Sequence, residues 1–268
     1  MNPQIGNGVT LFFEDLGPRD GAPVILIHGH PFNRTIWDPQ TAALTAAGYR
    51  VIAPDLRGYG QSPVVPGKTL LAAFADDLAA LLDRLGVEQA VVGGVSMGGQ
   101  IAMEMRLRHP GLVRALVLSD SSSPAETEDG KAFRLNLAER LLREGMKPYT
   151  DEVIDKMLAP YNVTGMPEAA AKVTAMMYAT APEGAAAALR GRAERPDYAP
   201  VLAALPAEVP CLIIVGRDDV YTPVAEAESL HALVPHSVLT VVERAGHLPG
   251  VEQPEAFNAA LLEFLAAL

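Results

Sequence analysis

Cysteine is nearly absent from this 268-residue sequence, in which Cys211 stands alone. No disulfide can form within the chain, and the apolar run 211–215 around this residue predicts an inert buried thiol. Basic residues are also scarce, since 21 Lys and Arg face 32 Asp and Glu, for a net charge of −11. Such an acidic chain repels a phosphate backbone, so we expect no nucleic-acid partner.

Long apolar stretches are missing as well. No uninterrupted apolar run reaches the roughly 18 residues that a membrane helix needs, so we expect no membrane partner. Residues 1–6 lack the basic start and the apolar stretch of a secretory signal, which predicts a cytoplasmic protein. The length suits one large domain, or a core domain that carries an insertion.

Short apolar runs alternate with segments of helical periodicity. The apolar residues in each run are continuous, which is typical of strands buried on both faces of a parallel sheet. The predicted strands span residues 24–27, 50–53, 90–94, 115–118, 211–215 and 238–242, and the predicted helices span 70–85, 98–109 and 254–268. We therefore predict an α/β fold with a mostly parallel central sheet flanked by helices.

Residues 124–200 break this alternation. Helical patterns occur at 133–144, 150–158, 168–179 and 183–193, and no convincing strand lies between them. We interpret residues 124–200 as a helical cap inserted into a core domain formed by residues 1–123 and 201–268. Its methionines (Met157, Met166, Met176 and Met177) predict an adaptable apolar inner face, although ordinary helix packing uses methionine in the same way.

The strongest chemical signal is Gly94-Val95-Ser96-Met97-Gly98, which is followed by Gly99. The motif stands directly after a predicted strand and directly before a predicted helix. Glycines at both ends permit a tight strand-to-helix turn that lifts the serine hydroxyl clear of the sheet. Ser96 is therefore the candidate nucleophile.

A serine hydroxyl needs a base that takes its proton, and the base needs an acid that orients it. Among six histidines, His247 lies in a loop just after the last predicted strand, where an open α/β sheet presents its ligands. The loop after residues 211–215 offers Asp218 and Asp219, and spacing does not choose between them. The unused carboxylate is expected to cap the turn or to pair with Arg217.

The loop His28-Gly29-His30-Pro31 follows the first predicted strand. Acyl transfer needs two N–H donors for the developing oxyanion, and we expect them from the backbone of His30 and of Met97. Pro31 has no N–H to give. A zinc site at His28 and His30 lacks a third ligand at suitable spacing, so we expect no metal.

A glycine-punctuated loop, Asp55-Leu56-Arg57-Gly58-Tyr59-Gly60-Gln61-Ser62, follows the second predicted strand. It lacks the Lys-Ser/Thr ending of a phosphate-binding loop, so we expect no nucleotide cofactor. We interpret it as a structural turn held by a network of Asp55 and Arg57.

These motifs, in this order, resemble the α/β-hydrolase superfamily, and above all its small esterase, non-metal haloperoxidase (perhydrolase) and enol-lactonase branch. The resemblance covers the core from about Gly8 to Leu268, whereas the cap is not diagnostic. The motifs that carry it are His28-Gly29-His30-Pro31, Asp55 to Ser62, Gly94 to Gly99, Gly216-Arg217-Asp218-Asp219 with Pro223, and Gly246-His247.

The resemblance implies further roles. In the family the catalytic aspartate stands three residues after the glycine and four before the proline, which selects Asp219 over Asp218. The family also implies an oxyanion hole from the amides of His30 and Met97. A histidine at position 30 is less usual than an aromatic or aliphatic residue, so its imidazole is a candidate for substrate contact. Dehalogenases and epoxide hydrolases of this fold carry aspartate where Ser96 stands, which argues against those activities.

We therefore expect a cofactor-free esterase with the triad Ser96, His247 and Asp219, acting on a small-molecule ester or lactone. Enol-lactone or carbon–carbon bond hydrolysis would need cap residues that bind a substrate carboxylate. Candidates are Arg190, Arg192 and Arg195, for which a solvated helix surface is the favoured alternative. Two further functions remain as alternatives: perhydrolysis, and a slow ligand receptor that keeps the triad. The sequence predicts neither the identity of the substrate nor the oligomeric state.

Overall fold

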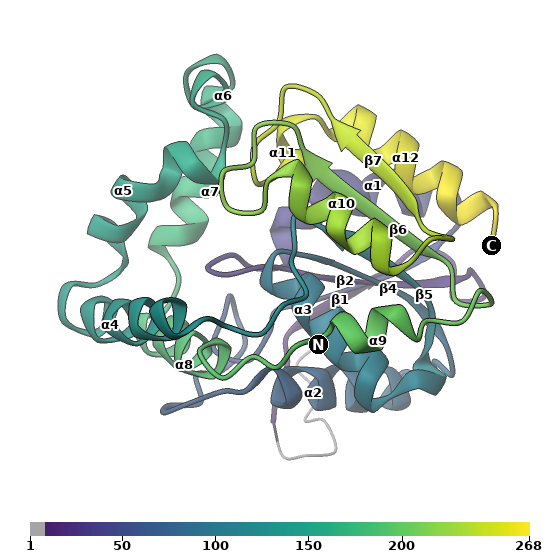
Figure 1. Cartoon of the computed structure of the whole chain (residues 1–268), viewed down its shortest axis with the longest axis horizontal. Helices are drawn as coiled ribbons and strands as arrows, with labels where there is room; N and C mark the ends of the chain where they lie inside the picture. The colour runs from purple at the N-terminus through teal and green to yellow at the C-terminus, as the bar shows by residue number, and fades with distance from the viewer. Residues whose placement is uncertain (1–8) are drawn as a thin grey trace.

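The predicted apolar runs form a parallel sheet in the computed structural model, which describes residues 9–268 (Figure 1). The parallel strands are β2 (Pro23–Ile27), β3 (Arg50–Pro54), β4 (Ala90–Val95), β5 (Val113–Ser119), β6 (Cys211–Gly216) and β7 (Val238–Val242). The seven-stranded order is β1-β3-β2-β4-β5-β6-β7. The unpredicted strand β1 (Phe13–Leu16) pairs antiparallel with β3 at the sheet edge. Its residues are half-buried or exposed, so it lacks a continuous apolar run.

Helices cover both faces of this sheet, which confirms the predicted α/β class. Successive side chains of a strand point to opposite faces, so Ile25 and Ile27 pack into one core and Val24 and Leu26 into the other. The first face carries α2 (Leu71–Arg84), α3 (Met97–Arg108), α9 (Ala199–Ala203) and α10 (Val224–Leu233). The second carries α1 (Asp38–Ala46) and α12 (Pro254–Ala266). The short helices η1 (Arg34–Trp37), η2 (Pro110–Leu112) and α11 (Pro249–Glu252) lie in connections.

Residues 128–192, all of which the structure describes, form five helices and no strand. They are α4 (Glu128–Glu144), α5 (Met146–Met157), α6 (Pro160–Gly165), α7 (Pro167–Tyr178) and α8 (Pro182–Arg192). They lie beside the sheet at the left of Figure 1. Met157, Met176 and Met177 are buried, and Met166 is half-buried. The domain boundaries at 123/124 and 200/201 stay a prediction.

Helix α8 lies directly on the backbone of the core. A Cβ atom at Gly184 would be 1.9 Å from the carbonyl oxygen of Gly58, and one at Gly191 would be 1.6 Å from that of Thr69. The amide of Thr69 in turn donates to the carbonyl of Ala187 at 2.9 Å. Only glycine permits this approach, so the position of α8 relative to the sheet is closely fixed.

The predicted network of Asp55 with Arg57 is wrong. Asp55 accepts hydrogen bonds from the backbone N–H and from Nη1 of Arg34, both at 2.9 Å, and from the amide of Gln61 at 2.8 Å. Arg57 instead pairs with Asp77 on α2. The loop is structural, but its partners come from segments far apart in the sequence.

Within residues 9–268, no helix has both the length and the apolar character needed to cross a bilayer. Residues 1–6, where we expect no secretory signal, lie outside the described residues. The cytoplasmic location stays a prediction.

We expect Gly191→Ala to lower the free energy of unfolding by about 1–3 kcal/mol, because the added methyl group overlaps a fixed carbonyl oxygen. Urea denaturation monitored by circular dichroism measures the change. Gly165→Ala is the matched control, since no heavy atom lies within 4 Å of a Cβ there, and it should change stability by less than about 0.5 kcal/mol. Equal midpoints for the two variants would contradict the close docking of α8.

Candidate active site

Ser96 occupies a sharp turn between β4 and α3. Its φ of 55° and ψ of −115° lie outside the ordinary regions for a residue with a side chain, a conformation that costs about 1–3 kcal/mol and persists only where its surroundings enforce it. The residue is half-buried and lines a pocket of about 490 Å³. The strained turn therefore presents the hydroxyl to a cavity.

The glycines around Ser96 are required by contact between backbones. A Cβ at Gly94 would lie 2.2 Å from the carbonyl group of Gly98, and one at Gly98 would lie 2.1 Å from the carbonyl oxygen of Ile27. A Cβ at Gly99 would lie 2.6 Å from that of Ser121. The end of β4, the start of α3 and the end of β2 thus meet at distances that exclude any side chain, which is the physical reason for the motif.

His247 and Asp219 form a buried hydrogen bond at the ends of β7 and β6. His247 Nδ1 lies 2.8 Å from Asp219 Oδ2, and each residue is 3% exposed. Burial alone would raise the pKa of Asp219, but the charge of His247 and hydrogen bonds from His247, Thr222 and Tyr221 lower it to about 2. Asp219 therefore stays ionised and holds the proton of the imidazole on Nδ1.

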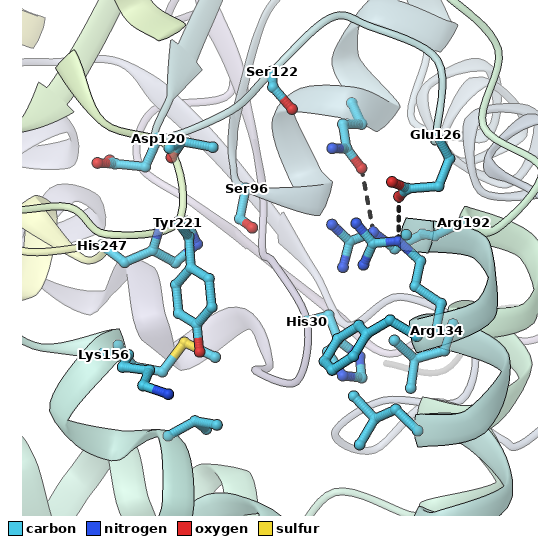
Figure 2. A pocket seen from close by; sticks show the side chains of 18 of the residues that line it. His30, Ser96, Asp120, Ser122, Glu126, Arg134, Lys156, Arg192, Tyr221 and His247 are labelled. Carbon is cyan, nitrogen blue, oxygen red and sulfur yellow. Dashed lines mark hydrogen bonds and ion pairs between the residues drawn. The ribbon is translucent and has the colours of Figure 1, made fainter. Parts of the chain in front are cut away.

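Ser96 and His247 line the same pocket (Figure 2). No hydrogen bond between their side chains is recorded within residues 9–268. Such bonds are often long in a free enzyme and tighten when substrate binds. The fold thus brings the predicted nucleophile and base to one cavity, and their catalytic roles stay a prediction.

The amides predicted for the oxyanion hole lie beside this turn. Met97 is the first residue of α3, so its N–H has no acceptor within the helix. A Cβ at Gly29 would be 3.2 Å from the Cβ of Ser96, so the loop that carries His30 packs against the nucleophile. No recorded hydrogen bond within residues 9–268 uses the amide of His30 or of Met97.

The side chain of His30 also lines the pocket, where substrate contact was predicted for it. Its Nδ1 lies 2.8 Å from the hydroxyl of Tyr59, and its buried Nε2 has no hydrogen-bond partner. Burial, together with the charges of Arg192, Arg134 and His28, lowers the pKa of His30. The ring is therefore neutral, and its Nε2 stays without a hydrogen-bond partner within residues 9–268.

His28 has a different environment from His30. Its Nδ1 lies 2.9 Å from the carbonyl oxygen of Gly29, and the amide of Leu56 donates to its Nε2 at 3.0 Å. Both ring nitrogens are thus used by the backbone, and His28 fastens the first loop to the loop after β3. It offers no lone pair for a metal.

Asp218 does not pair with Arg217, which was one of the two roles expected for the carboxylate that the triad leaves unused. Asp218 is exposed and accepts a hydrogen bond from the hydroxyl of Tyr161, while Arg217 pairs with Glu243. Asp219 is the buried member of the two neighbouring carboxylates.

Sequence reasoning missed Asp120, which follows β5 directly. Its Oδ1 accepts from the amide of Gly216 at 2.9 Å, and its Oδ2 from the hydroxyl of Ser119 at 2.5 Å. Burial, and next the charge of Asp219, raise its pKa well above the usual range. The pKa values of these two neighbouring carboxyl groups are thus shifted in opposite directions. Its position two residues after the predicted strand 115–118 was the signal that could have revealed Asp120.

Asp120, Asp219 and His247 offer ligand atoms within 4.8 Å of one another, which is close enough to hold a cation. Each already takes part in a hydrogen bond described above.

Glu252 was also missed, and it holds the loop that carries His247. It is 1% exposed. Its Oε1 accepts from the amide of Gly246 at 2.8 Å and from that of Leu248 at 3.4 Å, on either side of His247. Its Oε2 accepts from the amide of Ala159 at 2.8 Å. Glu252 thereby fixes the loop and joins it to the segment before α6; no motif marks it in the sequence.

The three arginines that were candidates for binding a substrate carboxylate have different environments. Arg190 is partly exposed and pairs with Glu139 on α4, as expected of a helix surface. Arg192 and Arg195 are each 8% exposed and line the pocket. The interpretation as solvated surface is therefore wrong for these two residues, because α8 and the segment after it turn inward over Ser96.

Comparisons with known proteins agree with this fold. Residues 22–254 match the family described as alpha/beta hydrolase fold. The chain is 31% identical to the AB hydrolase superfamily protein YisY of Bacillus subtilis, over 96% of this chain and 95% of that protein. It is 30% identical to 3-oxoadipate enol-lactonase 2 of Acinetobacter baylyi, over 94% and 92% of the two chains. A thermophilic esterase from Thermogutta terrifontis, solved with malate bound, superposes with a TM-score of 0.95 at 38% identity, covering 100% of this chain and 98% of its own.

The lowered pKa of Asp219 predicts a contribution to stability that depends on pH. The contribution is present above the usual value of 3.8 and is lost as pH falls toward about 2. The whole shift corresponds to about 2 kcal/mol. The difference in unfolding free energy between the natural protein and Asp219→Asn, from urea titrations at pH 5, 4 and 3, should shrink with falling pH. The exposed Asp218→Asn is the control, and a difference independent of pH would refute the ion pair.

We expect Glu252→Ala to lower the unfolding free energy by at least about 2 kcal/mol, because buried donors without acceptors cost about 1–3 kcal/mol each. Hydrolase activity should fall with it, since the loop of His247 loses its support. Glu255→Ala removes an exposed carboxylate three residues away and should be neutral. A Glu252→Ala protein of normal stability would show that the loop is held by other contacts.

Proposed function

The chain belongs to the α/β-hydrolase family, and on this premise we propose that it is a serine esterase that cleaves small-molecule carboxylic esters through an acyl-enzyme intermediate. The observation that carries the proposal is the 2.8 Å hydrogen bond between His247 Nδ1 and Asp219 Oδ2, beside the pocket that Ser96 and His247 line. A hydroxyl, an oriented base and an ionised acid are the parts that acyl transfer needs.

In the first proposed step, the Oγ atom of Ser96 attacks the ester carbonyl carbon. Its proton passes to Nε2 of His247, which is free to accept because Asp219 keeps the other ring proton on Nδ1. Asp219 stays ionised because its pKa is about 2, so it also stabilises the imidazolium that forms.

The carbonyl oxygen becomes negative as the Oγ–C bond forms. In our proposal the backbone N–H groups of His30 and Met97 donate to it. The positive end of the α3 dipole lies at the same place, because Ser96 is the N-cap of that helix. Fixed amides need no reorientation during the reaction, which is why they stabilise the transition state rather than the bound ester.

The tetrahedral intermediate then collapses. His247 returns the proton to the leaving oxygen, the bond from carbon to that oxygen breaks, and the alcohol departs. A water molecule attacks the acyl-enzyme with His247 again as base, and the acid is released as Ser96 regains its proton.

Support for ester substrates comes from the relatives, which include a solved esterase and a named enol-lactonase. A lactone is an internal ester and opens by the same steps, so lactone hydrolysis is the second candidate. The pocket of about 490 Å³ suits a small molecule.

We expect Ser96→Ala to lower kcat for p-nitrophenyl butyrate by a factor on the order of 10⁴–10⁶, as for other triads that lose their nucleophile. Ser122→Ala, which alters another serine of the pocket, should change kcat less than about threefold. The natural protein should turn over steadily, whereas a slow ligand receptor would stop after one burst. Near-normal hydrolysis by Ser96→Ala would defeat the proposal.

A further inference from the structure

Arg192 is a buried cation without a carboxylate partner. It ends α8, is 8% exposed, and lines the pocket together with Ser96. Its Nε donates to Oε1 of Gln100 at 3.2 Å. Across residues 9–268, no ion pair of its guanidinium and no hydrogen bond of its two terminal nitrogens is recorded. Burial of an unpaired charge is costly. An anionic group of a ligand bound in the pocket would therefore stabilise this guanidinium.

The neighbouring carboxylate pairs with other arginines and leaves Arg192 without an anionic partner within residues 9–268. Glu126 accepts a hydrogen bond from Nε of Arg134, and its nearer oxygen lies 3.9 Å from an Nη atom of Arg195. One buried carboxylate thus serves two arginines, and Arg192 is the third. The chain as a whole carries a charge of −11, so a positive pocket is not a general property of its surface.

A second unsatisfied group belongs to His30, which lines the same cavity. Nε2 of His30 is buried without a partner, while Nδ1 lies 2.8 Å from the hydroxyl of Tyr59. Burial raises the pKa of Tyr59 well above its usual range, so the hydroxyl keeps its proton and can donate it to Nδ1. With the hydroxyl as donor, Nε2 carries the ring hydrogen and has no acceptor within residues 9–268. An acceptor group of the substrate would satisfy both His30 and Arg192.

The position of Arg192 indicates which half of the ester carries that acceptor. His247 must reach the leaving oxygen to protonate it, so the alcohol lies on the side of His247. In Figure 2 Ser96 lies between His247 and Arg192, which puts the acyl chain on the side of the guanidinium. Gln100, which orients Arg192, follows Ser96 by about one helical turn, or roughly 5.4 Å along α3. The acyl chain is therefore short.

The guanidinium is also held in place by a rigid support. Gly191 brings α8 into backbone contact with Thr69, and Gln100 fixes the Nε side of Arg192 from α3. A pre-positioned cation of this kind recognises a carboxylate without reordering of the side chain.

We propose that Arg192, with His30 beside it, binds a carboxylate at the far end of the acyl chain, so that the preferred substrates are monoesters of short dicarboxylic acids. This inference rests on the ester hydrolysis proposed above. It goes beyond that proposal by naming the chemical class of the acid and the residue that selects it.

Ethanol release from monoethyl adipate, compared with its neutral analogue in which a carboxamide replaces the carboxylate, tests the proposal. The natural protein should prefer the anionic ester in kcat/KM by at least about tenfold, as expected for a charge-assisted contact. Arg192→Met should remove this preference, a loss of at least about tenfold that leaves similar kcat/KM values for the two esters. Arg190→Met, on the same helix but paired with Glu139, should keep it.

A second measurement needs no variant of Arg192. Free adipate should compete with p-nitrophenyl butyrate in the natural protein at least about tenfold better than adipamide does. Equal inhibition by adipate and adipamide, or equal kcat/KM for the two ethyl esters in the natural protein, would overturn the proposed carboxylate site. Either result would leave the proposed ester hydrolysis unaffected. Failure of the natural protein to hydrolyse any of the esters would instead overturn the proposed function itself.

Discussion

The turn at Ser96 is the constraint on which the rest of the site depends. Two strands and one helix meet there so closely that Gly94 and Gly98 cannot carry a Cβ atom, and Ser96 adopts a positive φ between them. This one packing arrangement orients the hydroxyl, leaves the amide of Met97 without an acceptor at the start of α3, and brings the loop of His30 against the nucleophile. The close packing at this turn thus positions the hydroxyl and the amides as acyl transfer requires.

The remaining groups reach this turn because the strands are parallel. Their carboxyl ends meet at one edge of the sheet, so Asp120, Asp219 and His247 come from three consecutive strands to one place. Their environments then separate them electrostatically: the charge of His247 and hydrogen bonds lower the pKa of Asp219, whereas burial and the charge of Asp219 raise the pKa of Asp120. Glu252 anchors the loop of His247, and the last residue of α8, Arg192, adds its guanidinium to the pocket. The sheet provides the proposed chemistry, and the helical insertion provides the proposed selectivity.

The sequence predicted the parts of this arrangement that depend on local pattern. Continuous apolar runs identified the parallel strands, and the glycines around Ser96 identified the turn, because both signals lie within a few residues. The edge strand β1 was missed because its residues are only half-buried. Contacts over long sequence distances could not be inferred, as the pairing of Asp55 with Arg34, the support by Glu252 and the inward position of Arg192 show. Each of these depends on how the loops and α8 pack, which no local pattern encodes, and the choice of Asp219 over Asp218 needed the family resemblance.

The central claim is that Ser96 is a nucleophile activated by His247. Reaction with a fluorophosphonate, followed by mass spectrometry of the digested protein, measures this most directly. The account predicts one adduct per chain, located on Ser96, that forms at least about a thousandfold more slowly in His247→Ala, since the serine hydroxyl then lacks the base that takes its proton. An adduct on another residue, or labelling of Ser96 at an unchanged rate without His247, would contradict it.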